Sequence, residues 1–290
     1  MITTSIIIVN YNSGDALREL LESLSPERTP DLEILIIDNA SADDSMDCIA
    51  DFRDGIRIVM NSDNVGFGKA VNQGIHLSKG RFVLLLNPDI VLCTGAVRAL
   101  ENFMIEHPDA GIAGGKIFST DGTLQLACRR GFPTPWVAFS RLSGLSFLLP
   151  KSKLFARYNM TFLDENSVSE VDAVSGSFML IRRDALDVAG VFDEDFFLYA
   201  EDIDICYRVH GAGWKIYYDP AAAVTHKKRT SAGSNQVRAT YEFYNTMWTF
   251  HKKHFKRSTP ALFNLFIWLG IACMKYSVTG MVILKKKIRR

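Results

Sequence analysis

The sequence predicts an α/β fold: a mostly parallel central sheet flanked by helices, followed by a helical extension at the C-terminal end. Strand-like apolar runs alternate with helical segments over the first 90 residues. Strands that are apolar throughout are typical of a parallel sheet covered on both faces. The chain has 290 residues, of which 48% are hydrophobic and 22% are charged, so it can bury a large core and is not disordered as a whole.

The predicted elements follow in order from the N-terminus. The β-branched run over residues 5–12 predicts the first strand. The leucines of the next segment recur at helical spacing, which predicts a helix capped by Ser13. The rest of this half continues the alternation, with strands over 32–41, 56–64 and 81–90 and helices over 43–52 and 68–78.

Polar side chains stand where these predicted strands end. Ligands of open α/β sheets bind beyond the carboxyl ends of the strands, so these residues are candidates for one site. Asp89, braced by Pro88, is well placed to bind a divalent cation through oxygen contacts, although Asn-Pro-Asp is also a good turn sequence. The full set is Asn10, Asn12, Asp38, Asn39, Asn61, Asn64, Asn87 and Asp89.

Two common nucleotide-binding motifs are missing. The turn after the first strand reads NYNSGDA, with one glycine where a dinucleotide fold needs G-x-G-x-x-G, so NAD binding is disfavoured. The stretch NVGFGKAVNQG over 64–74 has no glycine at the P-loop position and no Ser or Thr after Lys69. Glycines such as Gly66 still allow a phosphate or ribose to approach a helix N-terminus, and a simple tight turn is the alternative.

A second group of chemically active residues lies between 171 and 226. Ser175, Gly176 and Ser177 precede a strand-like run, FMLIRR. An aromatic run, DEDFFLYA, then leads into Glu201 and Asp202, which open a predicted helix. Aromatic rings beside a carboxylate suit a carbohydrate site, in which the carboxylate deprotonates a hydroxyl group. The alternative is that these acidic residues only stabilise the helix N-terminus.

Charge and cysteine content restrict the setting of the protein. A net charge of +1 argues against a nucleic-acid-binding surface. The five cysteines are scattered and never form CxxC, which favours a reducing compartment and disfavours a thiolate zinc site. The N-terminus lacks a basic region before its apolar run, so no signal peptide is predicted and we expect a cytoplasmic protein.

Seven stretches, in this order, resemble the family 2 inverting glycosyltransferases of the GT-A fold. The similarity is to the bacterial rhamnosyltransferase-like branch, which builds cell-surface polysaccharides such as O-antigen. It covers roughly residues 3 to 255 and implies a Rossmann-like GT-A catalytic domain over 1–258. The stretches are SIIIVNYNS, IIDNASADDS, NSDNVGFGKAVNQGI, LLLNPDI, VSGSFMLIRRDAL, GVFDEDFFLYAEDIDICYRV and DPAAAVTH.

The resemblance also implies roles for individual residues. Asp202, beside Glu201, matches the catalytic base, and Asp89 matches the metal-binding carboxylate of the DxD region. Asn87 replaces the first aspartate of that region, which implies weaker binding of Mg²⁺ or Mn²⁺, or help from His226, whose imidazole can complete a metal site. The implied nucleotide-sugar contacts are Asn10, Asn12, Asp38, Asn64, Gly66, Lys69, Asn87, Asp89, Ser175, Gly176 and Ser177.

The resemblance further implies a metal-dependent, inverting hexosyltransferase. The expected donor is dTDP-rhamnose, with UDP- and GDP-sugars as alternatives, and the expected acceptor is a saccharide or a polyprenyl-linked saccharide. A nucleotide-sugar-binding module without turnover is the competing hypothesis, because Asn87 departs from the DxD pattern. A homo-oligomer remains open.

The C-terminal segment 259–290 is apolar and then basic. Its apolar run from Ala261 to Met274 is short for a membrane span, and Lys275 interrupts it. We therefore expect a helix or helical pair in the membrane interface, on the inner face of the cell membrane, rather than a transmembrane helix. Packing against the catalytic domain or a second subunit is the alternative. The basic residues expected near anionic headgroups are Lys285, Lys286, Lys287, Arg289 and Arg290.

Overall fold

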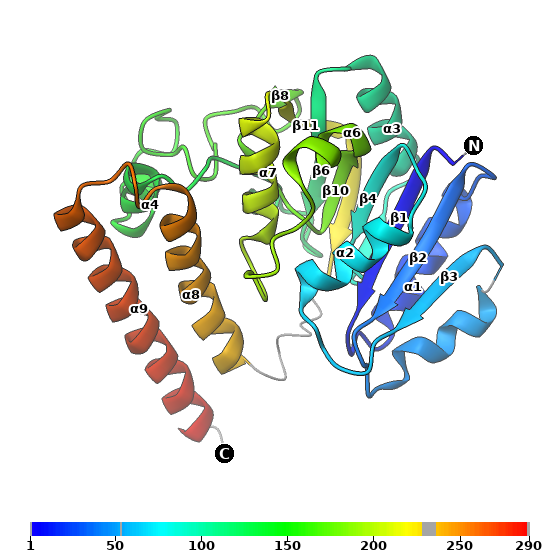
Figure 1. Cartoon of the computed structure of the whole chain (residues 1–290), viewed down its shortest axis with the longest axis horizontal. Coiled ribbons are helices and arrows are strands. Elements are labelled where there is room, and N and C mark those ends of the chain that lie inside the picture. The colour runs from blue at the N-terminus through cyan, green and yellow to red at the C-terminus, as the bar shows by residue number, and fades with distance from the viewer. Residues whose placement is uncertain (1, 53, 228–235, 289–290) are drawn as a thin grey trace.

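The computed structural model describes residues 2–52, 54–227 and 236–288 (Figure 1). Its core is a nine-stranded sheet in the order β3-β2-β1-β4-β10-β6-β11-β5, with β8 paired to β11, and a separate pair joins β7 to β9. The strands are β1 (Thr4–Asn10), β2 (Leu32–Asp38), β3 (Ile56–Met60), β4 (Phe82–Leu86), β5 (Ile90–Leu92), β6 (Ala110–Phe118), β7 (Arg129–Arg130), β8 (Ser169–Glu170), β9 (Ala173–Val174), β10 (Phe178–Arg182) and β11 (Lys215–His226).

Six of the nine strands of this sheet point in the same direction, namely β1, β2, β3, β4, β6 and β11. β1 is parallel to β2 and β4, β2 to β3, and β6 to β11. β10 runs antiparallel to β4 and β6, so its first residues lie where β4 ends. β1, β4 and β10 are buried along their whole length. The predicted α/β fold with a mostly parallel sheet is therefore confirmed.

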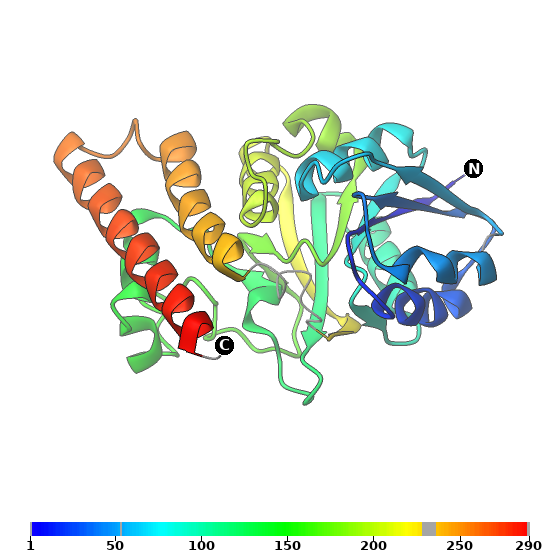
Figure 2. The same ribbon diagram turned by 90° about the horizontal axis from the view of Figure 1, so that it is seen from below.

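Helices cover both faces of the sheet. α2 and α7 lie on one face together with α6, and α1 and α3 lie on the other (Figures 1 and 2). The helical elements are α1 (Ala16–Leu24), η1 (Ser25–Glu27), η2 (Asp44–Asp51), α2 (Phe67–Leu77), α3 (Ala96–Glu106), η3 (Leu126–Cys128), α4 (Pro135–Leu142), α5 (Leu145–Leu148), α6 (Arg183–Ala189), α7 (Glu201–Gly211), α8 (Gln236–His254) and α9 (Ala261–Ile288).

Three local predictions differ from the structure. The first helix begins at Ala16, and Ser13 does not cap it, because the Ser13 hydroxyl donates to Asn10 Oδ1 at 2.5 Å. The segment predicted as a helix over 43–52 is a 3₁₀-helix capped by Asp43, whose Oδ1 accepts from the amide of Ser45. The predicted strands are also shorter in the structure: β2 ends at Asp38, β3 at Met60 and β4 at Leu86, not at residues 41, 64 and 90.

The C-terminal part of the described chain forms a helical hairpin, in which α8 and α9 pack together at one end of the molecule (Figures 1 and 2). α9 continues past Lys275, whose ammonium group lies 4.5 Å from the ring centre of Tyr241 on α8. The expectation that this apolar segment is too short to span a membrane is therefore wrong. By length and composition alone, Ala261–Leu284 can cross a membrane, with a mean hydropathy of 1.6 and none of that window buried. Arg289 and Arg290 lie outside the described residues.

Candidate active site

The ends of β1 and β2 carry a buried polar network. Asn10 and Asp38 are direct neighbours in the sheet, and both are fully buried. Asn10 Nδ2 donates to Asp38 Oδ1 at 2.8 Å and to Ser45 Oγ at 2.9 Å. Asp38 also accepts from the amide and the hydroxyl of Ser41, at 3.0 and 2.6 Å. These two predicted site residues therefore fix the loops that follow β1 and β2.

Further predicted polar residues join this network. Asn12 has a φ of 48°, a left-handed conformation that asparagine tolerates, and its Oδ1 accepts from the amide of Ala42 at 2.8 Å. Asn39 Nδ2 donates to the carbonyl of Gly66 at 3.2 Å, and Asn61 Nδ2 donates to Asn39 Oδ1 at 2.9 Å. The loops after β1, β2 and β3 thus meet at one edge of the sheet, as predicted.

The glycine loop before α2 packs on protein. Gly66 has a φ of 90°, and a Cβ there would meet the Phe197 ring at 3.0 Å. Its amide donates to Asn64 Oδ1 at 3.0 Å. Lys69 is exposed in the first turn of α2. Gly66 is therefore required for the close approach of the loop before α7, a packing role that the sequence motif did not indicate.

Asp89 and His226 lie side by side, although 137 positions separate them. Antiparallel pairing of β5 with β11 places His226 opposite Ile90. Asp89 Oδ1 is 3.0 Å from His226 Nε2, and His226 Nδ1 is 3.2 Å from Gln125 Oε1. Both side chains are mostly buried. The predicted pair is thus brought together, while within residues 2–52, 54–227 and 236–288 no group of three His, Cys, Asp or Glu side chains is arranged to hold a metal.

The third group lies at the start of β10. The amide of Asn87 donates to the carbonyl of Ser177 at 3.1 Å, which joins this group to the end of β4. The hydroxyls of Ser175 and Ser177 are 2.9 Å apart. The amide of Gly176 donates to Asp202 Oδ2 at 3.1 Å. A Cβ on Gly176 would lie only 3.1 Å from the Asp202 Cβ, so glycine allows this contact.

Arg130 is a site residue that sequence reasoning missed. Its Nη2 donates to Asp202 Oδ2 at 2.5 Å and to the carbonyl of Val174 at 2.9 Å. Arg130 and Asp202 are both largely buried. Burial alone would lower the pKa of Arg130, but the charge of Asp202 holds it above the ordinary value. Asp202 Oδ2 thus accepts from both Arg130 and Gly176. Asp202 Oδ1 accepts one hydrogen bond, from the amide of Ile203 at 2.8 Å.

Glu201, the neighbour of Asp202, is buried without a hydrogen-bond partner at Oε2. Burial, and then the negative charge of Asp202, raise the pKa of Glu201 to about 8. Both causes favour the protonated form of Glu201. A buried carboxyl group with a strongly raised pKa beside a second carboxyl group is typical of catalytic sites.

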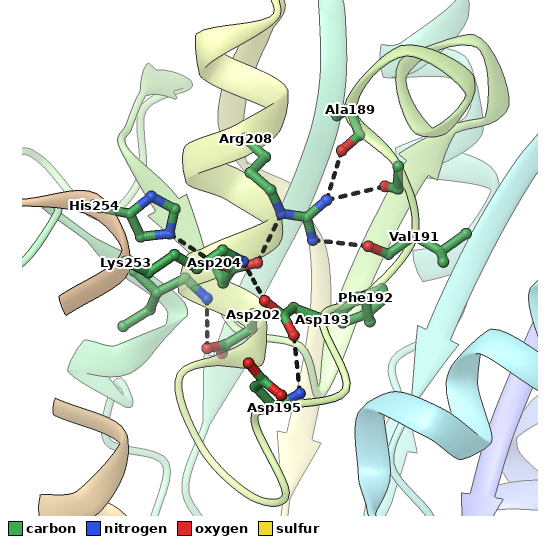
Figure 3. Close-up of polar contacts among 12 residues, drawn as sticks. Ala189, Val191, Phe192, Asp193, Asp195, Asp202, Asp204, Arg208, Lys253 and His254 are labelled. Carbon is green, nitrogen blue, oxygen red and sulfur yellow. Dashed lines mark hydrogen bonds and ion pairs between the residues drawn. The ribbon is translucent and has the colours of Figure 1, made fainter. Parts of the chain in front are cut away.

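Asp204 fastens the helix that carries Asp202 to the C-terminal hairpin (Figure 3). It is fully buried and accepts from Arg208 Nε, Lys253 Nζ and His254 Nε2, each at 2.7 Å. Lys253 also pairs with Asp193. Burial on its own would raise the pKa of Asp204, but the bonds from His254, Lys253 and Arg208 lower it to about 2. α7 and α8 are therefore joined by charged groups within the protein.

The rings of the aromatic run DEDFFLYA are only partly available to a ligand. Phe196 is buried in the core. Phe197 packs on the glycine loop and lies 4.4 Å below the guanidinium of Arg238. Tyr199 is 37% exposed. Tyr199 is thus the most exposed ring of the run, while Phe197 is half-buried.

This helix-flanked sheet, with carboxylates and amides gathered at the strand ends, has the GT-A-type fold. Residues 5–190 match the family described as Glycosyl transferase family 2. This match covers more than half of the 290 residues, so the chain belongs to glycosyl transferase family 2 and is a glycosyltransferase. The family resemblance predicted from the motifs is confirmed.

Individual relatives include rhamnosyltransferases. The chain is 30% identical over 239 residues to the N-acetylglucosaminyl-diphospho-decaprenol L-rhamnosyltransferase of Mycobacterium tuberculosis, covering 79% of this chain and 77% of the relative. It is 27% identical to the rhamnosyltransferase WbbL of Escherichia coli, covering 76% and 82%. The TarS structure from S. aureus aligns over 95% of this chain and 44% of TarS, at 18% identity and a TM-score of 0.59, which supports the fold.

Proposed function

We propose that this glycosyltransferase transfers L-rhamnose, with inversion, from dTDP-rhamnose to a hydroxyl of a lipid-linked saccharide in cell-surface polysaccharide synthesis. The observation that carries the proposal is the Asp202 carboxylate, held beside Gly176 and next to the strand end that bears Asn87 and Asp89. The names of the mycobacterial and Escherichia coli relatives support rhamnose as the sugar and, for the former, a polyprenyl-linked N-acetylglucosamine as acceptor.

Asp202 would act as the general base. Its Oδ2 is fixed by Arg130 and Gly176, whereas Oδ1 keeps a free lone pair to accept the acceptor hydroxyl proton. The alkoxide forms as the oxygen attacks the anomeric carbon, and the nucleoside diphosphate leaves from the opposite face. One such displacement inverts the anomeric configuration. General base catalysis of this kind contributes about 10²- to 10⁴-fold.

Arg130 would be a positioning residue in this reaction. An ion pair with a buried guanidinium makes a carboxylate a weaker base, but it also fixes the orientation of that carboxylate before the acceptor binds. Protonated Glu201 adds no second negative charge beside Asp202 at neutral pH. The group therefore carries one carboxylate charge matched by one guanidinium charge.

Asp89 and His226 would hold a divalent cation, Mg²⁺ or Mn²⁺. A carboxylate oxygen in contact with an imidazole nitrogen fits Mn²⁺ and tolerates Mg²⁺. The donor diphosphate would have to supply further oxygen ligands, because the described part of the chain adds no third His, Cys, Asp or Glu to this pair. Bound there, the cation would offset the negative charge that develops on the leaving diphosphate.

The remaining predicted residues would bind the nucleotide-sugar donor. Asn10 and Asp38 would shape the nucleotide site through the loops they fix. Asn64, Lys69 and Ser175 have side chains outside the packed core and would contact the donor directly. We propose that α9 associates with the inner face of the cell membrane, where a polyprenyl-linked acceptor lies, and that 1–258 is the catalytic domain.

The test is a transfer assay with the full chain and a lipid-linked N-acetylglucosamine acceptor. dTDP-rhamnose, UDP-glucose, UDP-galactose, UDP-N-acetylglucosamine and GDP-mannose are each supplied with Mg²⁺, Mn²⁺ or EDTA. We expect turnover with dTDP-rhamnose and a divalent cation, and a product of inverted anomeric configuration by NMR. If no donor is turned over but one of them raises the melting temperature of the protein, the nucleotide-sugar-binding module would be supported instead. Transfer only from a UDP- or GDP-sugar would change the proposed donor.

A further inference from the structure

Exposed apolar side chains are concentrated in two segments of the described chain. One is α9, with ten of them: Leu262, Phe263, Leu265, Phe266, Trp268, Leu269, Tyr276, Met281, Ile283 and Leu284. The other is the segment 135–157, which contains α4 and α5, with seven: Trp136, Phe139, Leu142, Phe147, Leu148, Leu149 and Leu154. Both views of the molecule place α4 at the same end as α8 and α9 (Figures 1 and 2).

The charge of the segment 135–157 has one sign. Its sequence, PWVAFSRLSGLSFLLPKSKLFAR, contains four basic residues and no acidic residue. The guanidinium of Arg141 lies 4.2 Å from the ring centre of Phe147, while Lys151 and Lys153 are exposed. Large apolar side chains interleaved with cations complement an anionic lipid surface, where rings enter the headgroup layer and cations pair with phosphates.

The segment is fastened to the candidate active site. Only Gly131–Thr134 separate Arg130, which contacts Asp202, from the first residue of α4. Between them, Phe132 is buried and packs edge-on against Tyr207 of α7, with ring centres 4.9 Å apart. Within the segment, Trp136 Nε1 donates to the carbonyl of Leu154 at 3.3 Å. A surface bound by this segment would therefore lie next to the part of the site that carries the proposed base.

We propose that the segment 135–157 is a lipid-binding surface that rests on an anionic bilayer alongside α9. Contact at two separate segments fixes the orientation of the domain on the membrane, whereas α9 alone leaves the domain free to tilt. The proposal concerns a surface and does not depend on the sugar or on the reaction, so it can be tested without turnover.

The test places an environment-sensitive label on the segment in the full chain. In a Cys93→Ser, Cys273→Ser background, which removes the exposed native thiols, Leu148→Cys carries an NBD fluorophore. The matched control is Met60→Cys, because Met60 is 62% exposed and Leu148 is 76% exposed, and β3 lies at the opposite end of the molecule from α4 (Figure 1). Each protein is reconstituted with vesicles of phosphatidylcholine alone or with phosphatidylglycerol.

We expect the label at 148 to shift to shorter emission wavelengths and to resist iodide quenching severalfold better with phosphatidylglycerol vesicles, while the label at 60 does not change. Lys151→Glu with Lys153→Glu should reverse this protection, since each basic residue near an anionic surface favours contact about fivefold. Vesicle-bound protein whose label at 148 is as quenchable as that at 60 would overturn the proposal. Protection without vesicles that rises with dimer formation would assign the surface to a second copy of the chain.

Discussion

The two polar groups at the strand ends differ in how completely their atoms are paired. Around Asn10 and Asp38, both fully buried, every contact described is a hydrogen bond between short side chains and loop amides. Around Asp202, by contrast, two neighbouring buried atoms have no partner: Arg130 Nε and Glu201 Oε2. The polar atoms described in the first group are hydrogen-bonded within the protein, whereas the second group contains buried polar atoms without a hydrogen-bond partner.

We interpret this difference as that between a scaffold and the proposed reaction centre. A buried, fully bonded network rigidifies the loops it joins. Unpartnered buried polar atoms cost free energy, so their presence usually has a functional explanation. The comparison therefore predicts that substitutions at Asp202 change the reaction, whereas substitutions at Asp38 change the folding stability first.

The largest expected effect is on the reaction. Asp202→Asn should lower the transfer rate by about 10²- to 10⁴-fold, because the amide cannot take up the acceptor proton. Donor affinity, measured by calorimetry, should remain close to that of the unmodified protein. Asp195→Asn is the matched control, since it removes an exposed carboxylate of the loop before α7 and should leave the rate unchanged. Substantial turnover by Asp202→Asn would exclude Asp202 as the base.

The next effect is on the pH dependence of stability. The pKa of Glu201 is raised to about 8 in the folded protein, so the folded state binds a proton that the unfolded state has released above pH ~4.3. The free energy of unfolding should therefore fall as pH rises from ~4.3 to about 8. Glu201→Gln cannot ionise and should remove this decline, which is on the order of 5 kcal/mol.

The measurement is urea unfolding, followed by circular dichroism, at several pH values between 5 and 9. Glu22→Gln provides the control, because Glu22 is an exposed glutamate on α1. If the unmodified protein and Glu201→Gln show the same pH dependence, Glu201 is ionised in the folded state and the neutral charge balance proposed for the site is wrong.

The smallest expected effect is at the scaffold. Asp38→Ala should lower the free energy of unfolding by about 2 kcal/mol, because the buried Asn10 amide and the Ser41 hydroxyl lose their acceptor. Asp63→Ala, at an exposed position, should change it by less than about 0.5 kcal/mol. The urea midpoint at unchanged m-value measures both. An unchanged midpoint for Asp38→Ala, together with weaker donor binding, would make Asp38 a nucleotide contact instead of a scaffold residue.

Much of the fold and part of the site could be predicted from local sequence. Apolar runs identified β1, β2 and β4 because a parallel strand buried on both faces must be apolar throughout. The clustering of strand-end residues such as Asn10, Asp38 and Asn61 follows from the parallel arrangement. The pairing of Asp89 with His226 was suggested by the residue types and by the family resemblance. No local pattern indicates it, because it depends on β5 meeting a strand more than a hundred residues later.

Arg130 could not be predicted in this way. Its partners, Val174 and Asp202, lie 44 and 72 positions along the chain, and the stretch CRRGFP gives no local indication of either. Likewise, the sequence gives no local indication that Lys275 of α9 lies over the ring of Tyr241 on α8. The elements and their chemical repertoire were thus determined by the sequence, through hydrophobic period and residue type. Only the tertiary structure decided which charges meet, because burial and distance, not sequence separation, set the strength of an ion pair.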